Sequence, residues 1–425
     1  MLRRCLLLSA VAIFAGGALP PEIVVTNCPA HFGGRFKGER ESTGPYKLRS
    51  AHCIDAKGIN SLTSPSMAPD GSGFAWLNRD EVAVADVKSG QTRTFATPLS
   101  NSGFQSLTGG EPPIGWSGDS KVVWAAKQEV AYPSHFPLSG LTLMRLARDG
   151  STVPTSLKPF PAGPLDAVQW IRNSAMALVQ VGTNGSYYRP PHADPAPELA
   201  MIDAAHGQVL DRLALSSLRS FNQRKAGFDA RFSIAAATAV VAAGRIRSVV
   251  TIRNQDGDTW VRWIQGSPPI EVASPFGKER RNRLVLVPSG KQVLNTRELQ
   301  PDGVQIICEA WSRNCPTVPP PKPRTGPLLE LRDFDTGKVL WSISTTVKDF
   351  WNGDILEVSP DGHFALVSWP EKKGGVFQAA LVDLNKGAVA QFFPLGVSGG
   401  EAGFTAKGNE VWTQLTNVIS IYRRS

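Results

Sequence analysis

Few of the reactive side chains in this sequence stand in a pattern that would support catalysis. Residues 396–400 read Gly-Val-Ser-Gly-Gly and match the G-x-S-x-G string of serine hydrolases. That motif needs a strand before the serine and a helix after it, so that the nucleophile is exposed. Here a strand pattern follows Gly400, and no histidine occurs downstream. We therefore interpret the segment as a loop.

Metal ligation is not indicated by the sequence either. The six histidines form no H-E-x-x-H motif and no pair at metal-binding spacing. Residues 256–258 (Asp-Gly-Asp) lack the further oxygen ligands of a calcium loop and suit a hairpin turn. We expect neither a metal nor another cofactor, and the sequence favours a protein without catalytic activity.

A repeated phrase identifies the elements that would position any functional residue. Residues 68–71 (Ala-Pro-Asp-Gly) and 359–362 (Ser-Pro-Asp-Gly) each precede an apolar strand pattern, a second strand and a turn of the form Asp-x-x-x-Gly. An aspartate in such a turn bonds backbone amides, and the glycine permits a positive φ. Asp70 and Asp361 are therefore predicted to be structural. Repetition at this spacing predicts a β-propeller.

The whole chain fits an all-β fold. It contains 40 glycines, 33 prolines and 11 tryptophans, and short β-branched and aromatic runs alternate with turn residues. The last segment holds only about three strands, and an open edge would invite pairing with other chains. We expect residues 23–27 or 46–54 to complete it, which gives seven blades, with six as the alternative. The expected blades are residues 61–98, 113–160, 166–215, 228–273, 283–344, 354–394 and 401–425.

The N-terminus reads as a secretory signal peptide. Arg3 and Arg4 precede an apolar run at residues 5–15 and small residues suited to cleavage. The predicted organisation is a signal peptide at 1–18, a segment at 19–60 that supplies the closing strand, and a propeller at 61–425. No later apolar run is long enough to span a bilayer. We expect a periplasmic or secreted protein.

Four cysteines follow the predicted signal peptide: Cys28, Cys53, Cys308 and Cys315. An even number in an exported chain suggests two disulfides, for which three pairings exist. We favour the local pairing, Cys28–Cys53 with Cys308–Cys315. A zinc site is disfavoured because the spacing does not fit.

The net charge of +9 does not by itself define a partner. In an exported chain a positive net charge fits a solvated surface without a specific partner, which is the interpretation that we favour. It also fits contact with anionic cell-surface polymers or lipid headgroups. We expect no nucleic-acid partner and a monomeric protein.

Two resemblances follow from these motifs. The Ser-Pro-Asp-Gly turns before apolar strands resemble the TolB-like, WD40-like (PD40-type) β-propeller repeat family, well at residues 68–77 and 359–369 and less closely elsewhere. Residues 333–341 (Asp-Phe-Asp-Thr-Gly-Lys-Val-Leu-Trp) resemble the docking motif of quinoprotein-type repeats. That resemblance implies that Trp341 packs between neighbouring blades; one copy does not imply a quinone cofactor.

Two proline-rich segments, at residues 187–197 and 316–327, interrupt the repeat. Insertions within blades reach the faces of a propeller, where ligands bind. We predict a non-catalytic module that binds a protein, peptide or glycan, as a binding or scaffold protein. The alternative is a propeller-type hydrolase, lyase or lactonase with a site at the channel mouth. The candidate contact residues share aromatic or polar character: Tyr187, Tyr188, His192, Trp311 and Arg313.

Overall fold

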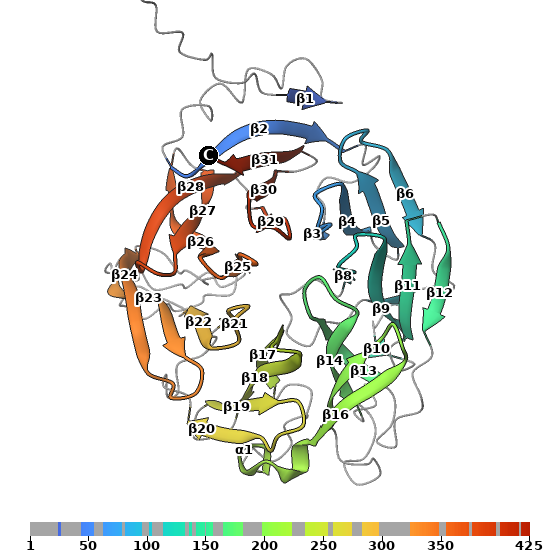
Figure 1. Cartoon of the computed structure of the whole chain (residues 1–425), viewed down its shortest axis with the longest axis vertical. Coiled ribbons are helices and arrows are strands. Elements are labelled where there is room, and N and C mark those ends of the chain that lie inside the picture. The colour runs from blue at the N-terminus through green and yellow to red at the C-terminus, as the bar shows by residue number, and fades with distance from the viewer. Residues whose placement is uncertain are drawn as a thin grey trace, which may run out of the picture.

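The protein is a seven-bladed β-propeller (Figure 1). In the computed structural model the described residues are 24–26, 44–54, 63–78, 81–95, 102–103, 114–131, 136–137, 142–148, 150–155, 165–181, 198–222, 234–253, 258–273, 283–296, 324–347, 354–373, 376–396, 400–415 and 418–425. Each blade is built on four antiparallel strands that lie side by side from the central channel to the rim.

The first four blades follow the chain in order. Their strands are β3 (Thr63–Met67), β4 (Gly73–Asn78), β5 (Glu81–Asp86) and β6 (Thr92–Phe95); β8 (Ile114–Trp116), β9 (Val122–Ala131), β11 (Thr142–Ala147) and β12 (Thr152–Thr155); β13 (Leu165–Trp170), β14 (Met176–Val181), β15 (Glu198–Asp203) and β16 (Gln208–Ala214); β17 (Ile234–Ala242), β18 (Arg245–Arg253), β19 (Asp258–Ile264) and β20 (Ile270–Ala273). Two short strands, β7 (Ser102–Gly103) and β10 (Phe136–Pro137), pair with β9. The 3-10 turn η3 (Leu215–Ser217) and α1 (Arg219–Asn222) link blades three and four.

The last three blades close the ring. Their strands are β21 (Arg283–Leu286), β22 (Gln292–Thr296), β23 (Arg324–Asp333) and β24 (Val339–Val347); β25 (Ile355–Val358), β26 (Phe364–Lys373), β27 (Val376–Asp383) and β28 (Ala388–Gly396); β29 (Ala402–Phe404), β30 (Glu410–Leu415), β31 (Val418–Arg424) and β2 (Tyr46–Cys53), with β1 (Val24–Thr26) outside β2. The proline-rich segment predicted at 316–327 is shorter than expected, because residues from Arg324 onward already pair with β24.

The core is divided among the junctions between blades. Seven clusters of buried apolar side chains each join two neighbouring blades, including the seventh blade to the first. Both faces of most sheets are therefore buried, which is why strands such as β14 (MALVQV) read as continuous apolar runs.

The repeated turns connect the inner two strands of the blades. In blades one, two and six, Oδ1 of the turn aspartate accepts the backbone amide two residues on, at 2.9, 3.1 and 3.1 Å for Asp70, Asp119 and Asp361. Gly71 and Gly362 take φ of +75° and +70°. The interpretation of Asp70 and Asp361 as structural residues is confirmed.

The two ends of the chain meet in blade seven. β2 pairs antiparallel with β31, from Tyr46 opposite Arg424 to Cys53 opposite Val418. The Gln391 side chain of blade six also donates to the Tyr46 carbonyl at 2.8 Å and accepts the Tyr46 amide at 2.9 Å. This side chain therefore fastens the N-terminal strand to the neighbouring blade as well.

Candidate functional site at the central channel

The strand order gives the ring two unlike faces. Because each blade repeats one meander, the connections between its first and second strands and between its third and fourth lie on one face, here called the turn face. The other connections lie on the opposite face, here called the loop face. Turns of neighbouring blades touch on the turn face; a Cβ on Gly408 would lie 3.4 Å from Pro360, for example. Among the connections between consecutive strands of one four-stranded blade, the two longest, residues 182–197 and 297–323, begin and end on the loop face.

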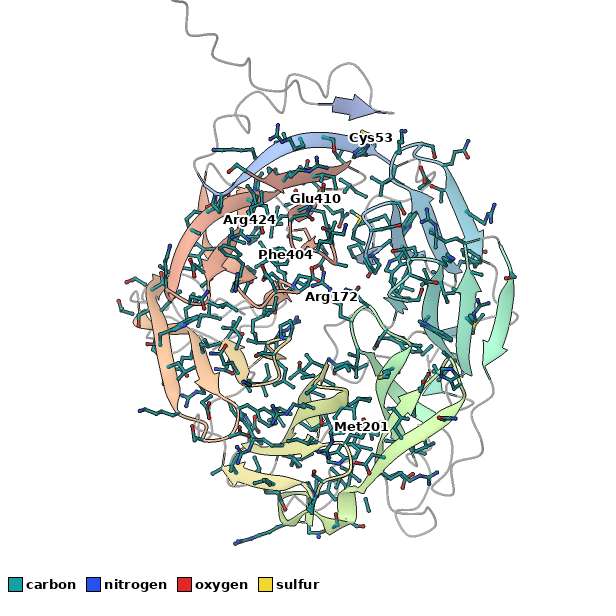
Figure 2. The ribbon with its side chains drawn as sticks, in the orientation of Figure 1. Cys53, Arg172, Met201, Phe404, Glu410 and Arg424 are labelled. Atoms are coloured by element: carbon teal, nitrogen blue, oxygen red, sulfur yellow. The ribbon has the colours of Figure 1, made fainter. Side chains whose placement is uncertain are left out.

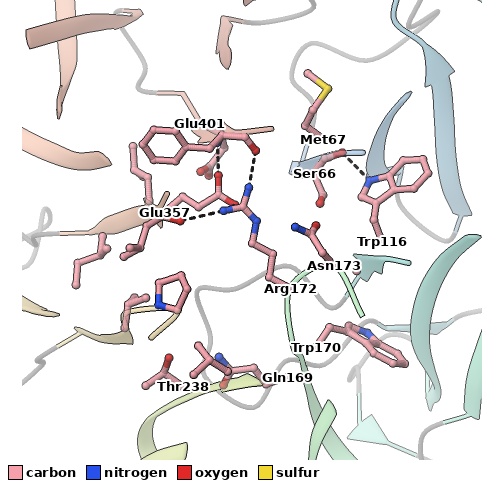
Figure 3. A pocket seen from close by; sticks show the side chains of 18 of the residues that line it. Ser66, Met67, Trp116, Gln169, Trp170, Arg172, Asn173, Thr238, Glu357 and Glu401 are labelled. Atoms are coloured by element: carbon pink, nitrogen blue, oxygen red, sulfur yellow. Dashed lines mark hydrogen bonds and ion pairs between the residues drawn. The ribbon is translucent and has the colours of Figure 1, made fainter. Parts of the chain in front are cut away.

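The central channel of the ring contains a cavity among the described residues. Its volume is about 350 Å³, and the inner strands of all seven blades contribute to it (Figure 3). One lining residue from each blade, in chain order, is Met67, Trp116, Gln169, Thr238, Leu286, Glu357 and Phe404. The lining therefore combines aromatic and aliphatic surface with a few polar and charged groups.

At the turn-face end, one arginine crosses the channel. Arg172 follows β13, and Figure 2 shows it near the middle of the ring. Its Nη1 lies 2.8 Å from Oε1 of Glu357 and donates to the Val358 carbonyl at 2.9 Å. Its Nη2 donates to the Phe404 carbonyl at 2.5 Å. Glu357 in turn accepts the Phe404 amide. The ion pair thus ties blade three to blades six and seven.

This ion pair is partly buried: the Arg172 side chain is 33% exposed and the Glu357 side chain 23%. Burial raises the pKa of Glu357 to about 7, while the Arg172 charge and the Phe404 amide act to lower it. Burial also lowers the pKa of Arg172, against the effect of Glu357. Desolvation therefore opposes the charged form of both partners.

The loop-face end of the channel carries a second group of charges. Arg283, Asp354 and Glu401 stand where the inner strands of blades five, six and seven begin. Nε of Arg283 lies 2.9 Å from Oδ1 of Asp354. Burial raises the pKa of Asp354. Burial and then the Asp354 charge raise the pKa of Glu401, and Arg283 acts against them. Two carboxylates therefore share one guanidinium at this mouth.

The described channel lining combines charged groups with few other reactive side chains. Its described lining contains no histidine, cysteine, lysine or tyrosine. The hydroxyl of Thr238 accepts the Leu286 amide at 3.0 Å, so it is tied to the neighbouring blade. Within the described ranges, no three His, Cys, Asp or Glu side chains gather closely enough to hold a metal ion. Besides Thr238, the described lining holds one other hydroxyl side chain, that of Ser66.

The contact residues expected from the sequence lie outside the described residues. These are Tyr187, Tyr188, His192, Trp311 and Arg313, and the hydrolase-like Ser398 lies outside them too. Their role as contacts stays a prediction. No helix in the described part of the chain is long and apolar enough to cross a membrane.

One of the four predicted disulfide cysteines lies in the described part of the chain. Cys53 is buried at the end of β2 and is disulfide-bonded. Cys28, Cys308 and Cys315 lie outside the described residues, so both predicted pairings stay predictions.

Trp341 lies where the docking motif implied. Its Nε1 donates to the Leu384 carbonyl of blade six at 2.7 Å, and a Cβ on Gly387 would lie 2.9 Å from its ring. The expectation that this tryptophan packs between neighbouring blades is confirmed.

The charged residues of the channel were not found from the sequence. Arg172 and Glu357 belong to different blades and no shared motif marks them. The signal that was available is position: Arg172 follows the inner strand of blade three, and Glu357 lies within the inner strand of blade six. Inner strands line the channel of a propeller, so a charged residue in or next to one is a candidate.

Comparison with known proteins adds only likeness of fold. No family model and no curated protein sequence matches the chain. Among solved structures, a eukaryotic initiation factor is 12% identical, with a TM-score of 0.40, over 86% of this chain and 84% of that one. TolB from Acinetobacter baumannii is 14% identical, with a TM-score of 0.38, over 80% of this chain and 65% of that one. The Dos1 propeller is 9% identical, with a TM-score of 0.44, over 89% and 96%. The class of this protein, a β-propeller, is therefore established by its own seven sheets.

Proposed function

We propose that this protein is an exported, non-catalytic β-propeller that binds a protein, peptide or glycan through its loop face. The observation that carries the proposal is the division between the faces. The described turns of the turn face are short and bonded within the ring, whereas the two longest connections between consecutive strands of one four-stranded blade both belong to the loop face. Segments placed by a rigid scaffold are where binding residues concentrate.

The composition of these connections supports binding. Tyr187 and Tyr188 precede a proline-rich run, and Trp311 lies between two cysteines that we predict to be bridged. Prolines and a disulfide both reduce the conformational entropy that a segment loses when it binds. Aromatic side chains supply large contact areas for peptides and sugars alike.

Export is supported by the N-terminal pattern at residues 1–18 and by the disulfide-bonded state of Cys53, since disulfides persist in oxidising compartments. N-terminal sequencing of the protein recovered from the periplasm or medium is expected to begin near residue 18 or 19. A mature chain that retains Arg3 and Arg4 would contradict export by this route.

The enzyme alternative is favoured by one observation, the raised pKa of Asp354 and of Glu401 at the channel mouth. Perturbed carboxyl groups in a cleft are candidates for acid–base chemistry. The test is a panel of lactone, ester and polysaccharide substrates. Turnover that Glu401→Gln abolishes would establish the alternative, and no turnover on the panel is the result we expect.

The test of binding uses peptide and glycan arrays probed with the mature protein. The key variant replaces residues 298–322 with a short Gly-Ser linker, which stops before β23 begins at Arg324. The matched control is Lys386→Ala, an exposed residue of the turn face. We expect array signals that the linker variant loses and the control keeps. Signals that survive both this replacement and that of residues 183–196 would contradict the proposal.

A further inference from the structure

Every blade leaves the outer edge of its last strand facing the rim, and unpaired edges invite other strands. Most of these edges carry a feature that hinders pairing. β6 and β12 are four residues long and contain Arg93 and Pro154, respectively. β16 places Asp211 and Arg212 in its middle. Short length, charge and proline are the features with which natural sheets protect their edges.

Three further edges are also covered or interrupted. β2 is paired with β1. On β20, the Glu271 carboxylate accepts the amides of Arg219 and Ser220 at 2.9 and 2.8 Å, which holds α1 beside the strand. β28 contains Pro394, and its Gln391 is bonded to the backbone of β2. Each of these six edges is therefore occupied, charged, short or broken.

The edge of β24 differs from all of them. This strand is nine residues long, reads VLWSISTTV, and contains neither a charge nor a proline. It is the last strand of its sheet, and within the described residues no strand pairs with its outer side. Leu340 is 47% exposed and Val339 is 39% exposed. An uncharged, β-branched edge of this length is a site for strand addition.

Side chains beside this edge form an apolar wall. Trp341 and Ile343 point toward blade six, where they pack against its buried cluster together with Trp369. The Trp369 ring lies edge-on to Phe392, with centroids 5.6 Å apart, and Phe392 is 41% exposed. A strand added to β24 would place alternate side chains against this wall, since successive side chains point to opposite faces.

We propose that the outer edge of β24 is a docking site for an extended, uncharged segment of a partner protein, which adds to blade five as a fifth strand. Blade seven shows that a rim edge of this ring accepts such a strand, because β1 lies along β2 with Val24 to Thr26 opposite Ser50 to His52. We expect the bound segment to be uncharged, because neither β24 nor the apolar wall beside it carries a charge that could pair with one. Apolar residues at alternate positions fit Trp341, Ile343 and Phe392. The site is separate from the loop-face segments, so it does not depend on the proposed function.

The test selects a displayed library of random peptides on the immobilised mature protein, then measures the affinity of a synthetic copy of the enriched peptide. The edge variant is Ser342→Lys with Ser344→Lys, at two exposed positions of β24. The matched control is Thr92→Lys with Thr94→Lys, which adds the same charges at the same spacing to exposed positions of β6. All four positions are exposed, so every variant is expected to fold.

We expect the enriched peptides to carry alternating apolar residues and no charge. The edge variant should bind such a peptide at least about tenfold more weakly than the wild-type protein does, and the control variant should bind it with unchanged affinity. In the complex, amide exchange should slow across residues 339–347 and not across 92–95. Failure to enrich any peptide, equal affinity for the edge variant, or protection elsewhere would overturn the proposal. If the wild-type protein forms a dimer and the edge variant alone does not, the edge binds a second copy of this chain, and the proposal is wrong.

Discussion

The two ends of the central channel hold similar charges in different ways. At the turn-face end, Glu357 and Arg172 bond each other and the backbone of β25 and β29, so both charges have partners within the ring. At the loop-face end, Glu401 and Asp354 face a single arginine, and the connection that follows Thr296 begins opposite Arg283. The contrast indicates that the turn-face pair joins three blades, and under the proposed function the loop-face charges are available to a ligand.

The largest expected effect comes from breaking the turn-face pair. Glu357→Leu removes the acceptor for the Arg172 guanidinium and the Phe404 amide, and leaving such donors without a partner costs up to about 3 kcal/mol. The double variant Arg172→Met with Glu357→Leu should recover part of that loss, because the guanidinium is then no longer left without its acceptor. Urea unfolding measures both. A single variant within about 0.5 kcal/mol of wild type would show that the pair does not hold the ring together.

Stability should also depend on pH through Glu357. Its pKa is raised from 4.5 to about 7, so the folded state binds the proton more tightly than the unfolded state does. This contribution is fully present below pH 4.5 and is lost as pH rises through 7. The expected fall is at most about 3 kcal/mol, since one pKa unit corresponds to about 1.4 kcal/mol. Unfolding curves from pH 5 to 8 measure it, and Glu357→Gln should remove most of the slope.

The repeated turns should contribute less each. In blade two, Asp119 accepts the Ser117 hydroxyl and the Lys121 amide, and these bonds lower the pKa of Asp119. Asp119→Ala should reduce the free energy of unfolding by about 1 kcal/mol, the net value of such bonds. Because its pKa is depressed, the stability from Asp119 is present above pH 3.8 and is lost on acidification below it. An unchanged urea midpoint at pH 7 would contradict this role.

The smallest effect is expected at the loop-face end, with the opposite sign. Glu401→Gln removes a carboxylate whose charged form is disfavoured by burial and then by the Asp354 charge, so stability at pH 8 should rise slightly, by less than about 1 kcal/mol. Glu357→Leu at the other end should lower it under the same conditions. If Glu401→Gln lowered the free energy of unfolding by as much as Glu357→Leu does, the two ends of the channel would not differ in the way described.

The sequence predicted features that each repeat specifies locally. Asp70 and Asp361 bond their own turns, and all seven expected blades coincide with sheets, because turn chemistry and apolar runs act over a few residues. Trp341 was placed by a motif of nine residues. The Arg172–Glu357 pair was missed because it joins different blades, and only ring closure brings those blades together. The unprotected edge of β24 was missed because it becomes visible only when all seven outer strands are compared.

The central claim is that contacts on the turn face hold the ring together and that the loop face binds the partner. The most direct measurement probes one peptide and glycan array with two variants, the linker replacement of residues 298–322 and Glu357→Leu, alongside urea unfolding of both. The account predicts that the linker variant loses binding and keeps its unfolding midpoint, while Glu357→Leu keeps binding in native buffer and loses stability. A linker variant that binds like wild type, beside a Glu357→Leu variant that is stable but no longer binds, would contradict it.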